Sequence, residues 1–443
     1  MKQGDANVSI ENIYQLDGRV PIGKAIPFGL QHVLAMFVAN ITPIIIVAAA
    51  SKITGNDLAM LIQNAMFIAG IGTMIQLYPI WRVGSKLPIV MGVSFTFVTI
   101  LCYVGGTFGY PAALGAILIG GIVEGMLGLF AKYWRKIISP VVSASVVITI
   151  GFSLLSVGAR SFGGGYVDDF GSFRYLGVAS FTLVCSLLFN VFAKGFWKQL
   201  SVLFGLVMGY ILALFMHMVD YSTIMDGGII SLPHFLPFMP EFNISAILAV
   251  VVIFLVSATE TIGDTSAMVA TGLNREITEK EISGSLACDG FASSISSLFG
   301  CMPITSFSQN VGLIAMTKVV NRFTIMTGAV CMILAGLFPP IGAFFSTLPD
   351  PVLGGCTIMM FGSIIVSGIQ MMGRCEMNTR NTTIAALSFG IGIGFTQIPE
   401  IFGAFPELIQ QVFANNCVAV VFVVAVILNL ALPKNMDIKK IEA

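Results

Sequence analysis

Long apolar stretches recur from one end of this sequence to the other, and they constrain its fold more than any other feature. Two of them cover residues 28–50 and 418–432, and a third surrounds residues 247–257. About 20 apolar residues in a helix cross the hydrocarbon core of a bilayer, where the backbone polar groups must be satisfied within the protein. The sequence therefore predicts an all-α polytopic membrane protein.

The charged residues indicate the same class. Only 10% of the 443 residues are charged, whereas about a quarter is usual in soluble domains. Basic and acidic residues balance at 22 each, so the net charge is zero and nothing indicates nucleic acid as a partner. The eight cysteines contain no Cys-x-x-Cys motif and lie mostly in apolar stretches, so we expect no disulfide, metal or cofactor.

Charged and Gly/Pro-rich breaks divide the apolar stretches into about fourteen predicted transmembrane spans. The spans begin near Ala25, Asp57, Leu87, Pro111, Arg135, Tyr175, Leu200, Ser245, Ser283, Pro303, Arg322, Val352, Thr382 and Ala414. The third and the tenth are too short, and too polar where they begin, to be ordinary spanning helices.

Basic residues predict the orientation of these spans. With a cytosolic N-terminus, 19 of the 22 Lys and Arg residues lie on the cytosolic side, and only Lys52, Arg160 and Arg174 lie outside. Residues 1–24 are charged and contain no apolar signal sequence, so we expect no cleavable signal peptide. We expect an integral protein of the cell membrane, plasma or inner, with both termini in the cytosol.

The two halves of the chain show matching features. Their first spans begin near Ala25 and Ser245, 220 residues apart. Seven spans separate these two positions, and an odd number inverts the second half relative to the first. Inverted repeats of this kind are typical of secondary transporters.

A Ser-Phe pair marks each of the two short spans. Ser94-Phe95 and Ser306-Phe307 are 212 residues apart, and each follows a proline and a stretch rich in β-branched residues. This pattern predicts an extended strand that turns into a half-helix near mid-membrane, which is tolerated only where it lines a protein-enclosed cavity. Two accidental dipeptides in a Phe-rich chain are the alternative, and the matched offset argues against it.

Four acidic residues lie within predicted spans, where an ionisable side chain costs roughly 2.5 to 3.5 kcal/mol on insertion scales. Glu260 and Asp264 are four residues apart and share one helical face. Such a pair suits a site that binds a substrate N–H with one carboxylate and takes up a proton with the other. Alternatively, the pair is simply solvated at the cytosolic interface.

The other ionisable residues within spans leave more than one role open. Asp289 lies among small residues, as either a second protonation site or a structural hydrogen-bond acceptor. Glu124 lies among four glycines that indicate helix packing, and its own role is left open. His32 is the only imidazole inside a predicted helix, and such a histidine is more often a hydrogen-bonded core residue than a proton carrier.

Residues 309–318 resemble the signature of the nucleobase-ascorbate transporter family, Gln/Glu/Pro-Asn-x-Gly-x4-Thr-Arg/Lys/Gly. Every constrained position matches, through Gln309, Asn310, Gly312, Thr317 and Lys318. Further matches are the Glu260-Thr261-x-Gly263-Asp264 segment, the pairs Ser94-Phe95 and Gln31-His32, and Asp289. The resemblance therefore covers both halves of the chain.

This resemblance implies two inverted repeats of seven spans, folded into a core domain and a gate domain and usually assembled as a homodimer. The core is expected to move against the gate during transport. The expected segments are a cytosolic N-terminal segment 1–24, core 25–131, gate 132–244, core 245–345, gate 346–432 and a cytosolic tail 433–443.

Site residues also follow from the resemblance. Glu260 and Gln309 are expected to hydrogen-bond the base. The residues expected to flank the base are Ser94, Phe95, Phe307 and Ser308. The residues expected to act in coupling or site geometry are Asp264, Asp289 and His32. The residue at the first signature position separates substrate classes in this family. Gln309 is similar to the xanthine and uric acid group, whereas a Glu at this position is typical of uracil permeases and a Pro of the vitamin C carriers. An amide has a donor and an acceptor that can pair with the O=C–N–H edge of an oxopurine.

We therefore expect a proton-coupled importer of xanthine or uric acid, whose partners are the nucleobase and the lipid bilayer. Coupling to sodium remains open, as does transport of uracil or of a broader range of nucleobases. An anion transporter on the same fold is a further alternative, and the expected centre argues against it because it holds acids and no Lys or Arg. An enzyme would need a metal-ligand cluster or a nucleophile with its base, and neither is visible. A receptor or structural role would leave the mid-membrane acids unused.

Overall fold

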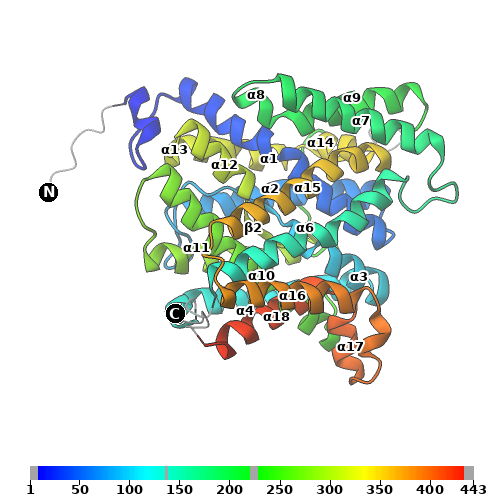
Figure 1. The fold of residues 1–443 in the computed structure, drawn as a ribbon. Helices are drawn as coiled ribbons and strands as arrows, with labels where there is room; N and C mark the ends of the chain where they lie inside the picture. Colours follow the sequence, from blue (N-terminus) through cyan, green and yellow to red (C-terminus); the bar gives the residue numbers. More distant parts are fainter. Residues whose placement is uncertain (1–7, 135–137, 220–227, 434–443) are drawn as a thin grey trace.

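A computed structural model describes residues 8–134, 138–219 and 228–433 (Figure 1). The first half contains η1 (Ile10–Tyr14), α1 (Ile22–Ala50), α2 (Gly55–Leu77), β1 (Met91–Val93), η2 (Phe95–Phe97), α3 (Val98–Phe108), α4 (Tyr110–Leu129), α5 (Ala131–Trp134), α6 (Pro140–Phe162), α7 (Phe173–Phe192), α8 (Phe196–Gln199) and α9 (Ser201–Phe215). The second half contains α10 (Ile244–Gly272), α11 (Glu279–Leu298), β2 (Ile304–Ser306), α12 (Ser308–Thr317), α13 (Arg322–Ala335), α14 (Pro339–Ser346), α15 (Asp350–Gly373), α16 (Thr379–Thr396), η4 (Pro399–Phe402), α17 (Glu407–Phe413) and α18 (Cys417–Ala431).

Fourteen helices correspond to the fourteen predicted spans, and the third and the tenth of them, α3 and α12, follow the strands β1 and β2. The fourteen are α1, α2, α3, α4, α6, α7, α9, α10, α11, α12, α13, α15, α16 and α18. Within the described ranges, seven helices are long and apolar enough to cross a membrane, namely α1, α2, α4, α6, α7, α10 and α15. The bent pairs α13 with α14 and α17 with α18 raise this number to nine. The remaining predicted spans are shorter or more polar, and they include the two broken ones. The predicted beginning of the fifth span, at Arg135, and all but one residue of the predicted cytosolic tail lie outside the described residues.

The inverted repeat is confirmed by the order and the length of the elements. Helices α1 and α10 each have 29 residues, α9 and α18 each have 15, and β1 and β2 each have three. The two strands pair antiparallel, with Gly92 opposite Thr305. Antiparallel pairing is what a two-fold axis in the membrane plane requires of equivalent strands.

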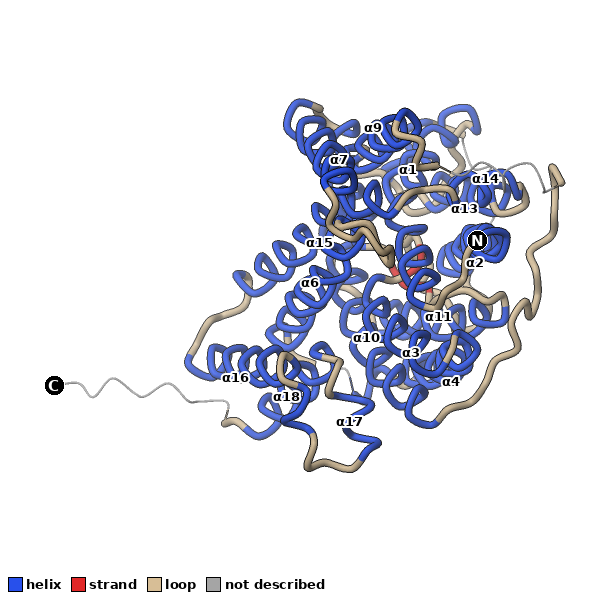
Figure 2. Tube along the Cα trace, turned by 90° about the vertical axis from the view of Figure 1, so that its right-hand side faces the viewer, coloured by secondary structure: helices blue, strands red, loops and turns tan. Residues whose placement is uncertain are grey.

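The helices form two groups, and the strand pair lies near the centre of the molecule (Figure 2). In the first group α1–α4 pack with α10–α13, and in the second α6, α7 and α9 pack with α15, α16 and α18. These groups correspond to a core and a gate, although the exact predicted boundaries stay a prediction.

Glycines allow the closest helix contacts inside each group. In the first, a Cβ added to Gly290 of α11 would lie 2.1 Å from the backbone nitrogen of Gly125 in α4. In the second, a Cβ on Gly354 of α15 would lie 2.2 Å from the backbone nitrogen of Phe162 at the end of α6. Small residues bring backbones together in this way because association in lipid depends on van der Waals packing.

Side chains of neighbouring helices satisfy the backbone of β1 away from its partner strand. The Val93 N–H donates to Asn40 Oδ1 at 2.7 Å, and the Met91 N–H donates to Thr73 Oγ1 at 3.0 Å. An unpaired strand edge at this depth would cost several kcal/mol for each polar group. Asn40 of α1 and Thr73 of α2 are therefore polar residues inside helices that serve the strand.

Strand β2 is held in the same way from α11. The Ser306 N–H donates to Asp289 Oδ2 at 3.2 Å, and the Ile304 N–H donates to Ser293 Oγ at 3.1 Å. The two broken spans are therefore anchored by equivalent devices, although the anchoring residues differ in type between the halves.

Candidate substrate site

A cavity of about 770 Å³ lies between the two helix groups. The core contributes residues of α1, α10 and α12 to its wall, and the gate contributes residues of α6 to α9 and of α15. The volume falls within the range of about 300 to 1,000 Å³ typical of small-molecule sites.

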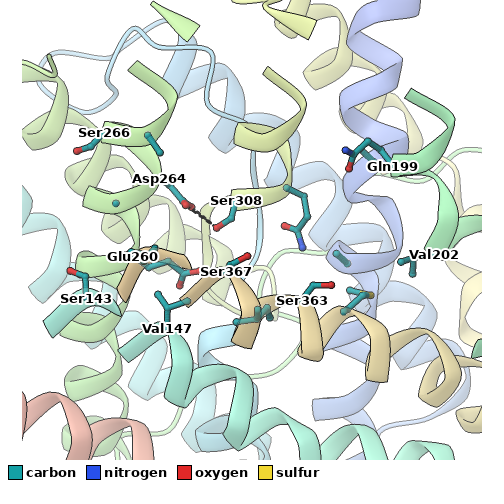
Figure 3. A pocket seen from close by; sticks show the side chains of 18 of the residues that line it. Ser143, Val147, Gln199, Val202, Glu260, Asp264, Ser266, Ser308, Ser363 and Ser367 are labelled. Carbon is teal, nitrogen blue, oxygen red and sulfur yellow. Dashed lines mark hydrogen bonds between the residues drawn. The ribbon is translucent and has the colours of Figure 1, made fainter. Parts of the chain in front are cut away.

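Glu260 projects into this cavity from the middle of α10 (Figure 3). The Thr96 hydroxyl donates to Glu260 Oε2 at 2.6 Å. Thr96 belongs to the short turn η2 that follows β1, so the first broken span orients the carboxylate on α10. The second oxygen, Oε1, has no hydrogen-bond partner among the described residues and is available to a ligand.

Asp264 lies one helical turn further along α10 and also lines the cavity. The Ser308 hydroxyl lies 2.8 and 2.9 Å from its two carboxylate oxygens, and the Ser306 hydroxyl donates to Oδ2 at 3.0 Å. Both serines flank Phe307, at the junction of β2 and α12. Asp264 therefore joins α10 to the second broken span, and Figure 3 shows the Ser308 contact.

Gln309 lies in the first turn of α12 and lines the same cavity as Glu260. The side chain is partly exposed, which leaves its amide accessible from the cavity. The structure thus brings together the two residues that we expect to hydrogen-bond the base, from helices more than 35 positions apart in the sequence. Of the expected flanking residues, Ser308 also lies in the wall.

The other expected flanking residues, Ser94, Phe95 and Phe307, are buried and lie outside the cavity wall. The Phe95 ring packs edge-on against Phe361 of α15, with centroids 5.4 Å apart. A side chain of the gate group is therefore in direct contact with Phe95. Whether these three residues contact substrate stays a prediction.

Asp289 and His32 lie behind the cavity. Asp289 accepts hydrogen bonds from the Thr261 hydroxyl at 2.5 Å and from Gln76 Nε2 at 3.3 Å, in addition to the β2 backbone. These contacts suit a structural acceptor, one of the two roles left open by the sequence. His32 is 2% exposed, and its Nδ1 lies 3.1 Å from Asn310 Nδ2.

The signature segment performs two different tasks in this structure. Asn310 Nδ2 also donates to the His32 carbonyl at 3.1 Å, which ties α12 to α1. Thr317 bonds within the helix to Leu313, and Lys318 ends it in a left-handed conformation with its Nζ on the Thr271 carbonyl. Gly312 is exposed with open space around it. Gln309 is thus the signature residue that lines the cavity, and its neighbours place the half-helix.

Sequence reasoning missed several residues of the site. Thr96 was the clearest case, because it directly follows Ser94-Phe95 and could have been included with that pair. The gate contributes Ser143, Ser363 and Ser367 to the wall, and uncharged serines give no signal in a hydropathy pattern. Two basic residues, Lys198 and Arg374, also line the cavity, whereas we expected a centre without Lys or Arg.

Two inverted repeats, a central antiparallel strand pair and a cavity between two helix groups define an integral membrane transporter. Solved transporters share this fold. The transmembrane domain of the cyanobacterial bicarbonate transporter BicA matches 92% of this chain and 97% of its own with a TM-score of 0.57 and 14% identity. Murine Slc26a9, an anion transporter in the inward-facing state, matches 96% of this chain and 73% of its own with a TM-score of 0.62 and 11% identity.

The chain belongs to the Permease family, whose model matches residues 23–401. Among its relatives, xanthine permease XanQ of Escherichia coli (strain K12) is 34% identical over 437 residues, which cover 95% of this chain and 94% of the relative. The xanthine permease of Bacillus subtilis (strain 168) is 33% identical over 95% of this chain and 96% of its own. A putative purine permease of Clostridium perfringens is 33% identical over 98% and 96%. Membership of the nucleobase-ascorbate transporter family, in its xanthine and uric acid group, is thereby confirmed.

Proposed function

We propose that this protein imports an oxopurine base, xanthine or uric acid, by proton symport. The observation that carries the proposal is the position of Glu260 and Gln309 in the wall of one cavity. A carboxylate accepts the N–H groups of one edge of the base, and an amide pairs with an O=C–N–H edge elsewhere. Relatives named xanthine permeases support this choice of substrate.

The transport cycle we propose moves the core group against the gate group. The cavity extends to Lys198 and Arg374, which the distribution of basic residues assigns to the cytosolic side. In this proposal the structure is open to the cytosol, and the Phe95–Phe361 contact separates when the core moves. A proton entering down a potential of about 100 mV supplies about 2.3 kcal/mol for the uptake of base.

Orientation and assembly belong to the same proposal. We propose that both termini are cytosolic, that the protein resides in the plasma or inner membrane, and that it forms a homodimer, as the family resemblance implies. The orientation can be tested with a reporter that is active only in the cytosol. Fused to the C-terminus, it should be active if this orientation is right.

Anion transport is a second candidate, which Lys198 and Arg374 in the cavity wall favour. A small inorganic anion would bind these two cations and offers no N–H group to Glu260, whereas an oxopurine has N–H groups that Glu260 can accept. Competition separates the two candidates. Excess unlabelled xanthine should abolish uptake of labelled xanthine, whereas excess bicarbonate or chloride should leave it unchanged.

The substrate assignment is tested by uptake of labelled xanthine, urate and uracil into cells that express the protein. We expect xanthine or urate to accumulate and a protonophore to abolish the accumulation. Uracil as the only good substrate would overturn the purine assignment, and sodium-dependent uptake that ignores the protonophore would overturn proton coupling.

A further inference from the structure

Glu124 of α4 is a buried acid to which the proposed function assigns no role. It is 1% exposed, and neither of its carboxylate oxygens has a hydrogen-bond partner among the described residues. A buried polar group without a partner is unusual in native structures and calls for an explanation. An ionised carboxylate in this position would be costly, because nothing replaces the water that it loses on burial.

The other three acids that lie within predicted spans differ from Glu124 in this respect. Glu260 accepts a hydrogen bond from Thr96, Asp264 accepts from two serines, and Asp289 accepts from two side chains and a backbone N–H. Hydroxyl and amide donors stabilise the charged form of a carboxyl group. Of these four acids, Glu124 is therefore the one whose charge the structure stabilises least.

Helix geometry places the Glu124 side chain in the groove between α10 and α11. Gly120, one turn before it, is so close to α10 that an added Cβ would lie 2.3 Å from the Phe254 ring. Gly128, one turn after it, is so close to α11 that a Cβ would lie 2.4 Å from the Ala287 backbone nitrogen. Glu124 lies between these contacts, on the face of α4 that packs against the helices carrying Glu260 and Asp289.

The titratable groups around Glu124 are mostly acids. Three helices pack against α4, namely α10, α11 and α3. Their titratable groups are Glu260 and Asp264 on α10; Glu279, Lys280, Glu281, Cys288 and Asp289 on α11; and Cys102 and Tyr103 on α3. Besides Lys280, a basic side chain lies at the end of α4, where Arg82 donates to the Leu129 carbonyl at 3.1 Å. Residue 129 is five positions, roughly 7.5 Å along the helix, from Glu124.

We propose that Glu124 binds the proton that is transported with the base. The inference rests on the proposed proton symport and names the group that carries the proton. A negative charge on Glu124 opposes the negative charge that Glu260 needs in order to accept the N–H groups of the base. Protonation of Glu124 removes this repulsion and strengthens base binding, and by linkage the bound base strengthens proton binding to the same extent.

The experiment compares the wild-type protein with Glu124→Gln, which has nearly the same shape but cannot take up a proton in this pH range. Binding of labelled xanthine to the purified proteins is measured across pH, together with accumulation in vesicles under an imposed proton gradient. For the wild type, affinity should fall as pH rises, by at most about tenfold per unit for one linked proton. For Glu124→Gln, affinity should no longer depend on pH, and accumulation under the gradient should be lost.

Glu241→Gln is the matched control, since Glu241 is exposed at the N-terminal side of α10 and should behave as the wild type in both assays. If Glu124→Gln keeps the wild-type pH dependence and accumulates xanthine, Glu124 does not carry the proton. If instead the wild type shows no proton-driven xanthine accumulation, the proposed function itself is wrong.

Glu124→Asp provides a second test should the glutamine variant fail to reach the membrane. The shorter side chain keeps a carboxyl group but changes its distance from Asp289 and Glu260, so the pH dependence of xanthine binding should shift. A pH profile that coincides with that of the wild type would overturn the inference.

Discussion

Thr96 occupies one oxygen of Glu260 and leaves the other available to a ligand. The first broken span therefore sets the direction in which the acceptor points, while α10 sets its position. In this account, the binding strength of the base depends on a single charged acceptor that is already oriented before the substrate arrives. The consequence can be tested at Glu260 itself.

Replacement Glu260→Gln should weaken xanthine binding by about 10- to 100-fold, because a hydrogen bond to a charged group contributes about 1.5 to 3 kcal/mol. Equilibrium binding to purified protein measures the effect without requiring transport. The variant should reach the membrane in normal amounts. Undiminished affinity would remove Glu260 from the base site.

We propose that Gln309 determines which edge of the base is recognised. In the Gln309→Glu variant a carboxylate replaces an amide that offers both a donor and an acceptor, and it should repel a carbonyl oxygen of the base. We expect xanthine uptake to fall at least tenfold, with a change in the order in which xanthine, urate and uracil compete. An unaltered competition order would show that this residue does not read the substrate.

At the scale of elements, the two broken spans depend on side chains of intact helices. Asn40 of α1 accepts the Val93 N–H of β1, and Asp289 of α11 accepts the Ser306 N–H of β2. Polar residues that a sequence reading assigns to catalysis or coupling can therefore be required by a strand edge. Asp289 is an example, since its hydrogen bonds suit a structural acceptor for β2.

Removal of the β1 anchor by Asn40→Ala should destabilise the protein by about 1 to 3 kcal/mol, because a buried N–H loses its acceptor. Thermal denaturation in detergent, followed with and without xanthine, would show the loss as a lower midpoint. Thr383→Val is the control, since the Thr383 hydroxyl donates within its own helix to the Thr379 carbonyl at 2.8 Å. Equal midpoints for the Asn40 variant and the control would contradict the role of Asn40.

At the scale of the whole molecule, much of the fold could be predicted from the sequence. The beginnings of the spans follow from hydropathy, and the strand positions follow from the Ser-Phe pairs after Pro88 and Pro303. These features are local or repeat at a fixed offset, so one sequence suffices to find them. The acids within predicted spans indicated Glu260, and the family signature added Gln309; both lie in one cavity wall.

The rest depended on how the two groups of helices meet. Ser143 and Ser367 line the cavity because α6 and α15 lie opposite α10, and neither residue differs in the sequence from serines buried elsewhere. The contact between Phe95 and Phe361 likewise joins a core residue to a gate residue far away in the sequence. Contacts between segments far apart in the chain leave no periodic signal, so they could not be predicted.

Coupled movement of a purine and a proton is the central claim, and the purified protein in sealed vesicles tests it most directly. With no initial pH difference, xanthine added outside should enter together with protons and make the external solution more alkaline. Vesicles without added xanthine should show no pH change. Vesicles that contain the Glu260→Gln variant should show none when xanthine is added. Xanthine entry without a pH change, or entry that requires sodium, would contradict the account.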